Sequence, residues 1–146
     1  MLFGYGTFCR ETWRRAIFGA DYPAAPATLA GWRRAATPSG YLSVVRAPGA
    51  CVRGIAIALD AAGWKIADAW EDVPLYRRVT VRIETGGGPQ SASVYVYRDA
   101  AALLPARIED DTVALLDDAA VETAVARFAP RMRAIRAALD GDATRR

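Results

Sequence analysis

Glu71 is the residue whose neighbours best suit it to move protons. It follows residues 61–70, which are typical of a short helix with Asp60 as the N-cap. A carboxylate at a helix C-terminus meets the negative end of the helix dipole, and Trp70 and Val73 reduce its solvation. Both effects favour the neutral acid, so we expect a raised pKa for Glu71, which suits general acid–base catalysis.

Other carboxylates in the segment offer alternatives to this interpretation. Asp72 is the rival for a catalytic role, and Asp68, one turn earlier, is expected to face solvent. A surface glutamate that merely ends a helix is the ordinary alternative for Glu71. Because the chain contains no histidine, Ser-His-Asp and Cys-His catalysis and imidazole metal sites are excluded within it.

The second segment that can support chemistry is the turn Tyr5-Gly6-Thr7-Phe8, after an apolar strand at residues 2–5. Gly6 lets a ligand approach the main chain with no Cβ in the way. If a helix begins just after the turn, the amides of Gly6, Thr7 and Phe8 point outward at its positive end, which suits a carboxylate. We expect Thr7 to add a hydroxyl donor and Tyr5 to form part of the pocket wall. An ordinary strand-to-helix turn is the alternative.

Short strands must position these two segments. The predicted strands cover residues 2–5, 28–34, 41–46, 51–59, 77–84 and 91–97, and the predicted early helices cover residues 10–18 and 61–70. Gly86-Gly87-Gly88-Pro89 predicts the turn of a hairpin between the last two strands. Since strands and helices do not alternate as βαβ units, we expect an α+β fold with a mostly antiparallel sheet closing into a small barrel.

The C-terminal stretch predicts a long amphipathic helix. Its apolar stripe has spacings of 4, 3, 4, 3 and 4 and consists of Val121, Val125, Phe128, Met132, Ile135 and Leu139. Pro130 predicts a kink or a split, and Gly141 predicts the end of the helix. We expect the stripe to pack against the sheet, with a partner-binding helix as the alternative.

Composition favours one globular domain over the 146 residues, with 53% hydrophobic and 24% charged residues. No apolar run approaches the ~18 residues of a membrane span, no leader is evident, and two cysteines suggest a reduced, cytoplasmic setting. The net charge is +3, but the basic residues are spread along the chain rather than clustered, so no nucleic-acid partner is expected.

Five short motifs, in order and with matching spacing over residues 2–97, resemble the γ-glutamylcyclotransferase-like family. They are Tyr5-Gly6-Thr7-Phe8, Leu29-Ala30-Gly31-Trp32, Val52-Arg53-Gly54-Ile55, Ala67-Asp68-Ala69-Trp70-Glu71 and Tyr76-Arg77-Arg78. The resemblance implies a small β-barrel flanked by helices that uses neither cofactor nor metal. It implies an enzyme that cyclises a γ-glutamyl group to 5-oxoproline and releases the attached amine, with a small γ-glutamyl amine or peptide as substrate.

The resemblance also implies roles for individual residues. The turn of Tyr5, Gly6, Thr7 and Phe8 would hold the α-carboxylate of the γ-glutamyl group through main-chain amides, and Glu71 matches the catalytic glutamate. Tyr76 either points its hydroxyl at the substrate or simply packs in its strand. Arg77 and Arg78 form a solvated strand face, one of them being a candidate contact for a distal substrate carboxylate. Cys9 is interpreted as structural, since no base partner is evident.

This chain departs from the family pattern in several places. Phe8 replaces a usual Leu, Trp70 replaces Phe or Tyr, Gly4 is unusual within an opening strand, and residues 41–45 replace a Tyr-Pro segment. Residues 98–146, helical in part from about residue 99, have no counterpart and either cover one end of the pocket or form a homodimer contact. A non-catalytic ligand-binding or regulatory module on the same fold is the alternative function.

Overall fold

The computed structural model describes residues 1–71, 75–105 and 117–145, and its strands form one closed sheet. The strands are β1 (Leu2–Gly4), β2 (Ala24–Ala36), β3 (Leu42–Ile57), β4 (Tyr76–Thr85), β5 (Gly88–Tyr97) and β6 (Leu104–Pro105). Their order is β3-β1-β5-β4-β2-β6, and the additional pairing of β3 with β2 closes β1 to β5 into a barrel. Only β1 and β5 pair in parallel within this described sheet, so the predicted α+β, mostly antiparallel barrel is confirmed.

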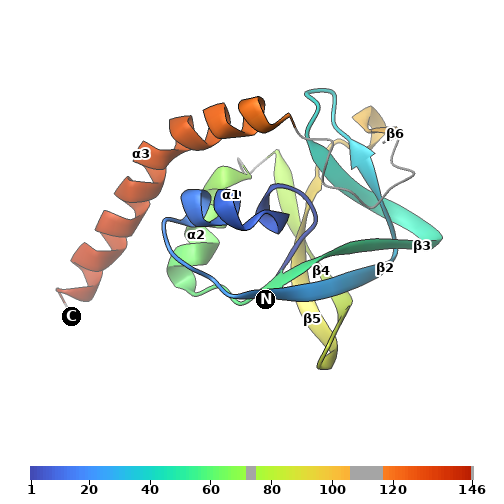
Figure 1. The fold of residues 1–146 in the computed structure, drawn as a ribbon, viewed down its shortest axis with the longest axis horizontal. Coiled ribbons are helices and arrows are strands. Elements are labelled where there is room, and N and C mark those ends of the chain that lie inside the picture. Colours follow the sequence, from blue (N-terminus) through green and yellow to red (C-terminus); the bar gives the residue numbers. More distant parts are fainter. Residues whose placement is uncertain (72–74, 106–116, 146) are drawn as a thin grey trace.

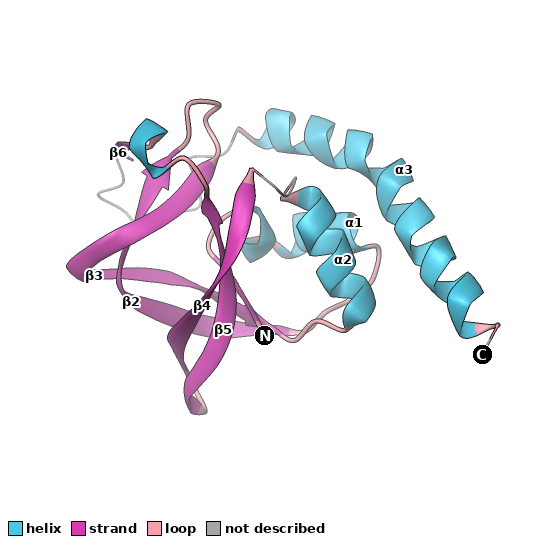
Figure 2. Ribbon diagram, turned by 180° about the vertical axis from the view of Figure 1, so that it is seen from behind, coloured by secondary structure: helices cyan, strands magenta, loops and turns pink. Residues whose placement is uncertain are grey.

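The three α-helices and the first 3₁₀ helix gather on one side of this barrel, whereas the second 3₁₀ helix lies beside β6 (Figures 1 and 2). They are the 3₁₀ helices η1 (Thr7–Cys9) and η2 (Ala100–Ala102) and the α-helices α1 (Glu11–Phe18), α2 (Ala61–Trp70) and α3 (Asp118–Ala143). Within the described ranges, no helix is long and apolar enough to cross a membrane.

The hairpin of β2 and β3 is longer than predicted, because two expected strands, at 41–46 and 51–59, are parts of the single strand β3. The register shifts between Ala30 and Trp32, where Gly31 adopts a φ of +79°. Such a bulge bends a long ribbon and increases its twist, which helps a small sheet close into a barrel. This conformation also explains the glycine in the motif Leu29-Ala30-Gly31-Trp32, since few other residues accept a positive φ.

Close backbone approach explains a second glycine motif, Val52-Arg53-Gly54-Ile55. A Cβ on Gly54 would lie 2.2 Å from the carbonyl oxygen of Gly4, closer than such atoms can approach. A Cβ on Gly4 would lie 3.1 Å from the Cβ of Phe8, so the unusual glycine of the opening strand lets the following turn fold back tightly. These two glycines therefore allow β1 to deliver the turn to the end of the barrel.

Helix α2 spans the predicted residues 61–70, and Asp60 caps it as predicted. The carboxylate of Asp60 accepts the amide of Gly63 at 2.7 Å and the hydroxyl of Tyr22 at 2.6 Å. The hydroxyl of Tyr22 and then the amide of Gly63 lower the pKa of Asp60. The beginning of α2 is thus fixed, and its other end carries Trp70 and Glu71.

Helix α3 corrects the prediction for Gly141 and decides between the two predictions for Pro130. It passes through Gly141, which was expected to end it; Gly141 lacks the positive φ of a capping glycine. Pro130 does not split the helix, and α3 changes direction along its length (Figure 1). A proline removes one helical hydrogen bond and bends the axis, while the remaining bonds keep the helix continuous.

The apolar stripe of α3 packs mainly against α1 and α2, not against the sheet as predicted. Val121, Phe128 and Met132 are buried, and the Phe128 ring meets the Trp70 ring edge-on, with centroids 5.3 Å apart. The guanidinium of Arg136 donates to the carbonyl of Phe18 at 2.8 Å. The prediction was wrong because α1 and α2 lie over this side of the barrel and offer α3 their own apolar surface (Figure 2).

Candidate active site

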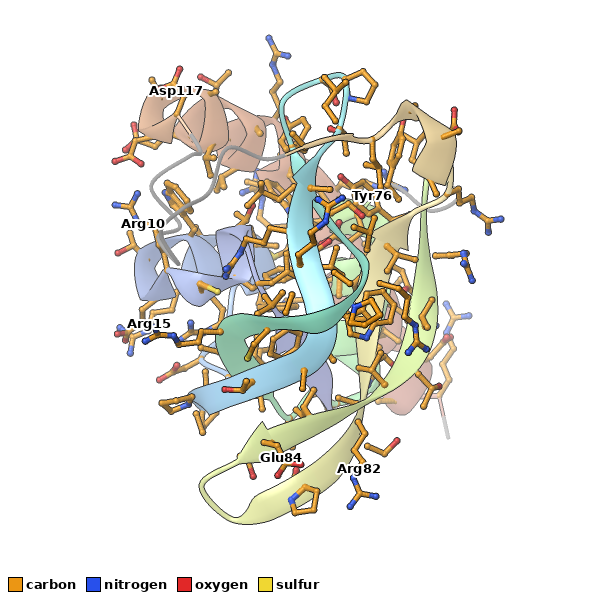
Figure 3. The ribbon with its side chains drawn as sticks, turned by 90° about the vertical axis from the view of Figure 1, so that its right-hand side faces the viewer. Arg10, Arg15, Tyr76, Arg82, Glu84 and Asp117 are labelled. Carbon is orange, nitrogen blue, oxygen red and sulfur yellow. The ribbon has the colours of Figure 1, made fainter. Side chains whose placement is uncertain are left out.

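A cavity of about 480 Å³ lies where the N-terminal turn, the end of α2, the barrel and α3 meet. All six residues predicted for the site line it: Tyr5, Gly6, Thr7, Phe8, Glu71 and Tyr76. Segments more than sixty residues apart in sequence, residues 5–8 and Glu71, therefore face one space. Figure 3 shows Tyr76 near one end of the barrel, with Arg82 and Glu84 toward the tip of the β4–β5 hairpin at the other.

The Glu71 carboxyl group faces this space in a largely desolvated setting. Its backbone amide donates to the carbonyl of Ala67 at 2.9 Å, which ends α2 at this residue. Burial raises the pKa of Glu71 to about 8, the direction that the sequence predicts. No described residue forms a hydrogen bond or ion pair with the Glu71 carboxylate. Every buried side-chain oxygen of the described chain has a partner, so the carboxylate oxygens of Glu71 are not fully buried and open onto the cavity.

The turn differs from the prediction in where the helix begins. The amides of Cys9 and Arg10 donate to the carbonyls of Gly6 and Thr7, at 2.9 and 3.4 Å, and make the 3₁₀ helix η1. The longer helix α1 starts only at Glu11. The turn is therefore not the N-terminus of α1, because η1 intervenes, and a three-residue helix has little dipole. Main-chain atoms and the Thr7 side chain remain as its polar contribution to the wall.

The hydroxyls of the two tyrosines predicted for the site, Tyr5 and Tyr76, are bonded to the main chain. The hydroxyl of Tyr5 donates to the carbonyl of Tyr95 at 2.7 Å, and that of Tyr76 donates to the carbonyl of Leu42 at 3.1 Å. Burial, and next the nearby charge of Glu71, raise the pKa of both phenols. Tyr5 and Tyr76 are thus neutral walls of the cavity, and Tyr76 is a packed strand residue at the same time.

Asp68 does not simply face solvent, which corrects the prediction for it. Its carboxylate accepts the hydroxyl of Tyr95 at 2.6 Å and pairs with Arg78 at 3.1 Å, and its side chain is 31% exposed. The Arg78 guanidinium also lies over the Trp64 ring, 5.0 Å from its centroid. Neither Arg77 nor Arg78 is among the described residues that line the cavity, so the suggested contact with a distal carboxylate stays a prediction.

Helix α3 supplies wall residues that the sequence analysis did not name as site residues: Ala124, Arg127, Phe128 and Arg131. Of the two roles considered for residues 98–146, covering one end of the pocket is the one that this helix fulfils. A homodimer contact stays a prediction. The sequence did carry a signal for these wall residues: Arg127 and Arg131 are spaced i and i+4, with Phe128 of the apolar stripe between them.

The remaining candidates add little to the site. Burial raises the pKa of the Cys9 thiol to about 11, and its sulfur lies 3.4 Å from the carbonyl of Gly4, so Cys9 is structural as interpreted. Asp72 and Val73 lie outside the described residues. No group of three His, Cys, Asp or Glu residues in the described chain could hold a metal ion.

Comparison with known families now gives this geometry a context. Residues 2–117 match the family described as gamma-glutamyl cyclotransferase, AIG2-like. The chain belongs to this family. The match extends twenty residues beyond residues 2–97, the range of the resemblance, and no curated protein matches the chain.

Several solved structures share the fold of this gamma-glutamyl cyclotransferase, AIG2-like family member. A solution structure from Arabidopsis thaliana is 22% identical, with a TM-score of 0.62 over 74% of this chain and 76% of the other. A second solution structure from Arabidopsis thaliana is 19% identical, with a TM-score of 0.60 over 97% and 82%. A structure named gamma-glutamyl cyclotransferase is 17% identical, with a TM-score of 0.59 over 73% and 70%.

Proposed function

We propose that this chain cyclises a γ-glutamyl group to 5-oxoproline and releases the attached amine, with Glu71 as general acid and base. The observation that carries the proposal is the position of Glu71, whose carboxyl group has no partner among the described residues and opens onto the cavity walled by residues 5–8. A carboxyl group with a pKa near 8 exchanges protons readily at neutral pH. Membership of the family supports the same chemistry.

The reaction needs one carboxylate and no other acid or base. Glu71 takes a proton from the substrate's α-ammonium, and the freed amine attacks the γ-carbonyl carbon of the same molecule to form a five-membered ring. The tetrahedral intermediate then breaks its bond to the original amine, to which Glu71 returns the first proton. The ring nitrogen still carries one proton too many, and Glu71 passes that second proton to the departing amine as well. The products are 5-oxoproline and the ammonium form of the amine, with no net change in protons on the enzyme.

Glu71 must start this cycle as a carboxylate, although the empty site favours the neutral acid. The bound α-ammonium favours the charged form, because an opposite charge a few ångströms away lowers a carboxyl pKa. Since the attack is intramolecular, the walls of the cavity help chiefly by holding the glutamyl arm in a folded, reactive pose. The buried tyrosines Tyr5 and Tyr76 are rigid enough for this, because their hydroxyls are fixed to backbone carbonyls.

The test is the replacement Glu71→Gln, which keeps the shape of the side chain and removes its ability to transfer a proton. Wild type and variant are incubated with a panel of γ-glutamyl compounds, and 5-oxoproline is measured by mass spectrometry. We expect kcat/KM to fall by at least about 10²-fold. The matched control is Glu84→Gln, an exposed carboxylate at the hairpin end away from Tyr76, which should retain full activity (Figure 3).

Two outcomes would contradict the proposal. Full activity in a correctly folded Glu71→Gln variant would remove Glu71 as the acid and base. Recovery of intact γ-glutamyl ligand from the wild-type complex, with no lactam after long incubation, would favour the non-catalytic binding module instead. Thermal unfolding of each variant shows whether the fold is retained.

A further inference from the structure

Helix α3 presents two arginines to the cavity, one helical turn apart. Arg127 and Arg131 both line it, and both side chains are exposed. Residues four apart lie on the same face of a helix, so the two guanidinium groups are neighbours at the cavity wall. Two like charges at this spacing destabilise a helix slightly, so helix stability does not explain why both arginines lie at the cavity.

Neither arginine has a partner in the described part of the chain. Other arginines at this helical side do: Arg10 pairs with Asp118, and Arg136 donates to the carbonyl of Phe18. Arg127 and Arg131 form no described ion pair or hydrogen bond. Their hydrogen-bonding capacity therefore remains for a bound molecule, and guanidinium groups are well suited to bind carboxylates by paired hydrogen bonds.

The charge of the cavity wall favours an anion. Glu71 is the single acidic side chain among the described residues that line it. Because burial raises the pKa of Glu71 to about 8, this group is mostly neutral at pH 7 in the empty site. The wall then carries two positive charges and little negative charge, and such a concave surface attracts anions.

The position of the arginines relative to Glu71 is fixed by packing. Phe128, beside Arg127 in sequence, is buried edge-on against Trp70, and Trp70 directly precedes Glu71. The face of α3 that carries the arginines is therefore anchored to the helix end that carries the proposed acid and base. The turn at residues 5–8 is a separate wall of the same cavity, and it is the proposed site for the glutamyl α-carboxylate.

We propose that Arg127 and Arg131 bind a carboxylate on the amine half of the substrate, so that the enzyme prefers γ-glutamyl amino acids or peptides over γ-glutamyl derivatives of uncharged amines. This inference rests on the proposed function for the orientation of the substrate. A molecule with one carboxylate at each end matches two separate anion-binding walls, with the scissile amide between them beside Glu71. Arg127 and Arg131 act as specificity-determining residues and take no part in proton transfer.

The experiment measures binding, so that it does not depend on turnover. In the Glu71→Gln background, calorimetry gives the Kd of γ-glutamylglycine and of γ-glutamylglycinamide, which differ only in the distal carboxylate. We expect γ-glutamylglycine to bind about 10- to 100-fold more tightly. Adding Arg127→Gln and Arg131→Gln should abolish this preference and leave the affinity for the amide unchanged. Arg133→Gln, an exposed arginine of α3 outside the described cavity lining, should change neither affinity.

Each other result overturns the inference. Equal affinity for the two ligands before the arginines are changed would mean that no distal carboxylate is recognised. An equal loss for both ligands would place the arginines at the glutamyl head or in a structural role, and failure of γ-glutamylglycine to bind would exclude the site. Turnover by the wild type is scored separately: a carboxylate preference without 5-oxoproline contradicts the cyclisation alone, whereas 5-oxoproline without a preference contradicts the arginine site alone.

Discussion

The hydroxyl of Tyr95 donates to the carboxylate of Asp68 at 2.6 Å, and the carbonyl of the same tyrosine accepts the hydroxyl of Tyr5 at 2.7 Å. One residue of β5 thus joins the last turn of α2 to the N-terminal turn. Asp68 precedes Glu71 by three residues, so this bridge controls how far Glu71 lies from residues 5–8. The two segments of the proposed site, residues 5–8 and Glu71, are therefore connected to each other through this strand of the barrel.

Removing the bridging hydroxyl with Tyr95→Phe should destabilise the protein and impair catalysis. The aromatic ring stays packed, but a hydrogen bond to a charged group is lost, which costs about 1.5–3 kcal/mol. Urea unfolding measures this change. The proposed enzyme should lose more in kcat than in KM, because Glu71 is misplaced while the cavity persists. The control Tyr97→Phe removes a cavity-lining hydroxyl that has no described partner, and equal stability of the two variants would contradict the bridge.

The raised pKa of Glu71 predicts a pH dependence of stability. An unfolded glutamate ionises near its ordinary value of 4.5, whereas the folded one ionises near 8. The folded state therefore holds the proton more tightly, and the contribution of Glu71 to the free energy of unfolding falls as pH rises from about 4.5 to about 8. The loss is on the order of a few kcal/mol, at about 1.4 kcal/mol per pKa unit. Glu71→Gln cannot ionise and lacks this contribution.

Urea unfolding of wild type and Glu71→Gln at several pH values between 5 and 8 tests this prediction. The difference in unfolding free energy, wild type minus variant, should decrease steadily across the range and level off above it. Using the difference removes the titrations that the two proteins share. A difference that stays constant from pH 5 to 8 would show that Glu71 is ionised in the folded protein throughout.

The sequence predicted the site where local patterns carry the information. Glu71 at the end of an amphipathic helix and the glycine turn after an apolar strand are local features, and the motifs placed them in one pocket. The sequence did not predict the contacts that depend on how the helices pack against the barrel and against each other. Whether Asp68 meets Tyr95 depends on how α2 lies on the barrel, and whether Arg127 faces the cavity depends on which surface α3 covers. The stripe of α3 showed that one face is buried, but no pattern stated that α1 and α2, rather than the sheet, bury it.

The contact of Phe128 with Trp70 leads to the last prediction. Phe128→Ala removes a buried ring whose edge meets Trp70, and should lower the free energy of unfolding by about 3 kcal/mol. Because this ring anchors the arginine-bearing face of α3 beside Glu71, the preference for γ-glutamylglycine over γ-glutamylglycinamide should fall as well. Phe128→Leu retains most of the apolar contact and should keep most of both properties. A Phe128→Ala variant that unfolds at lower urea yet keeps the full preference would show that the arginines are positioned by other contacts of α3.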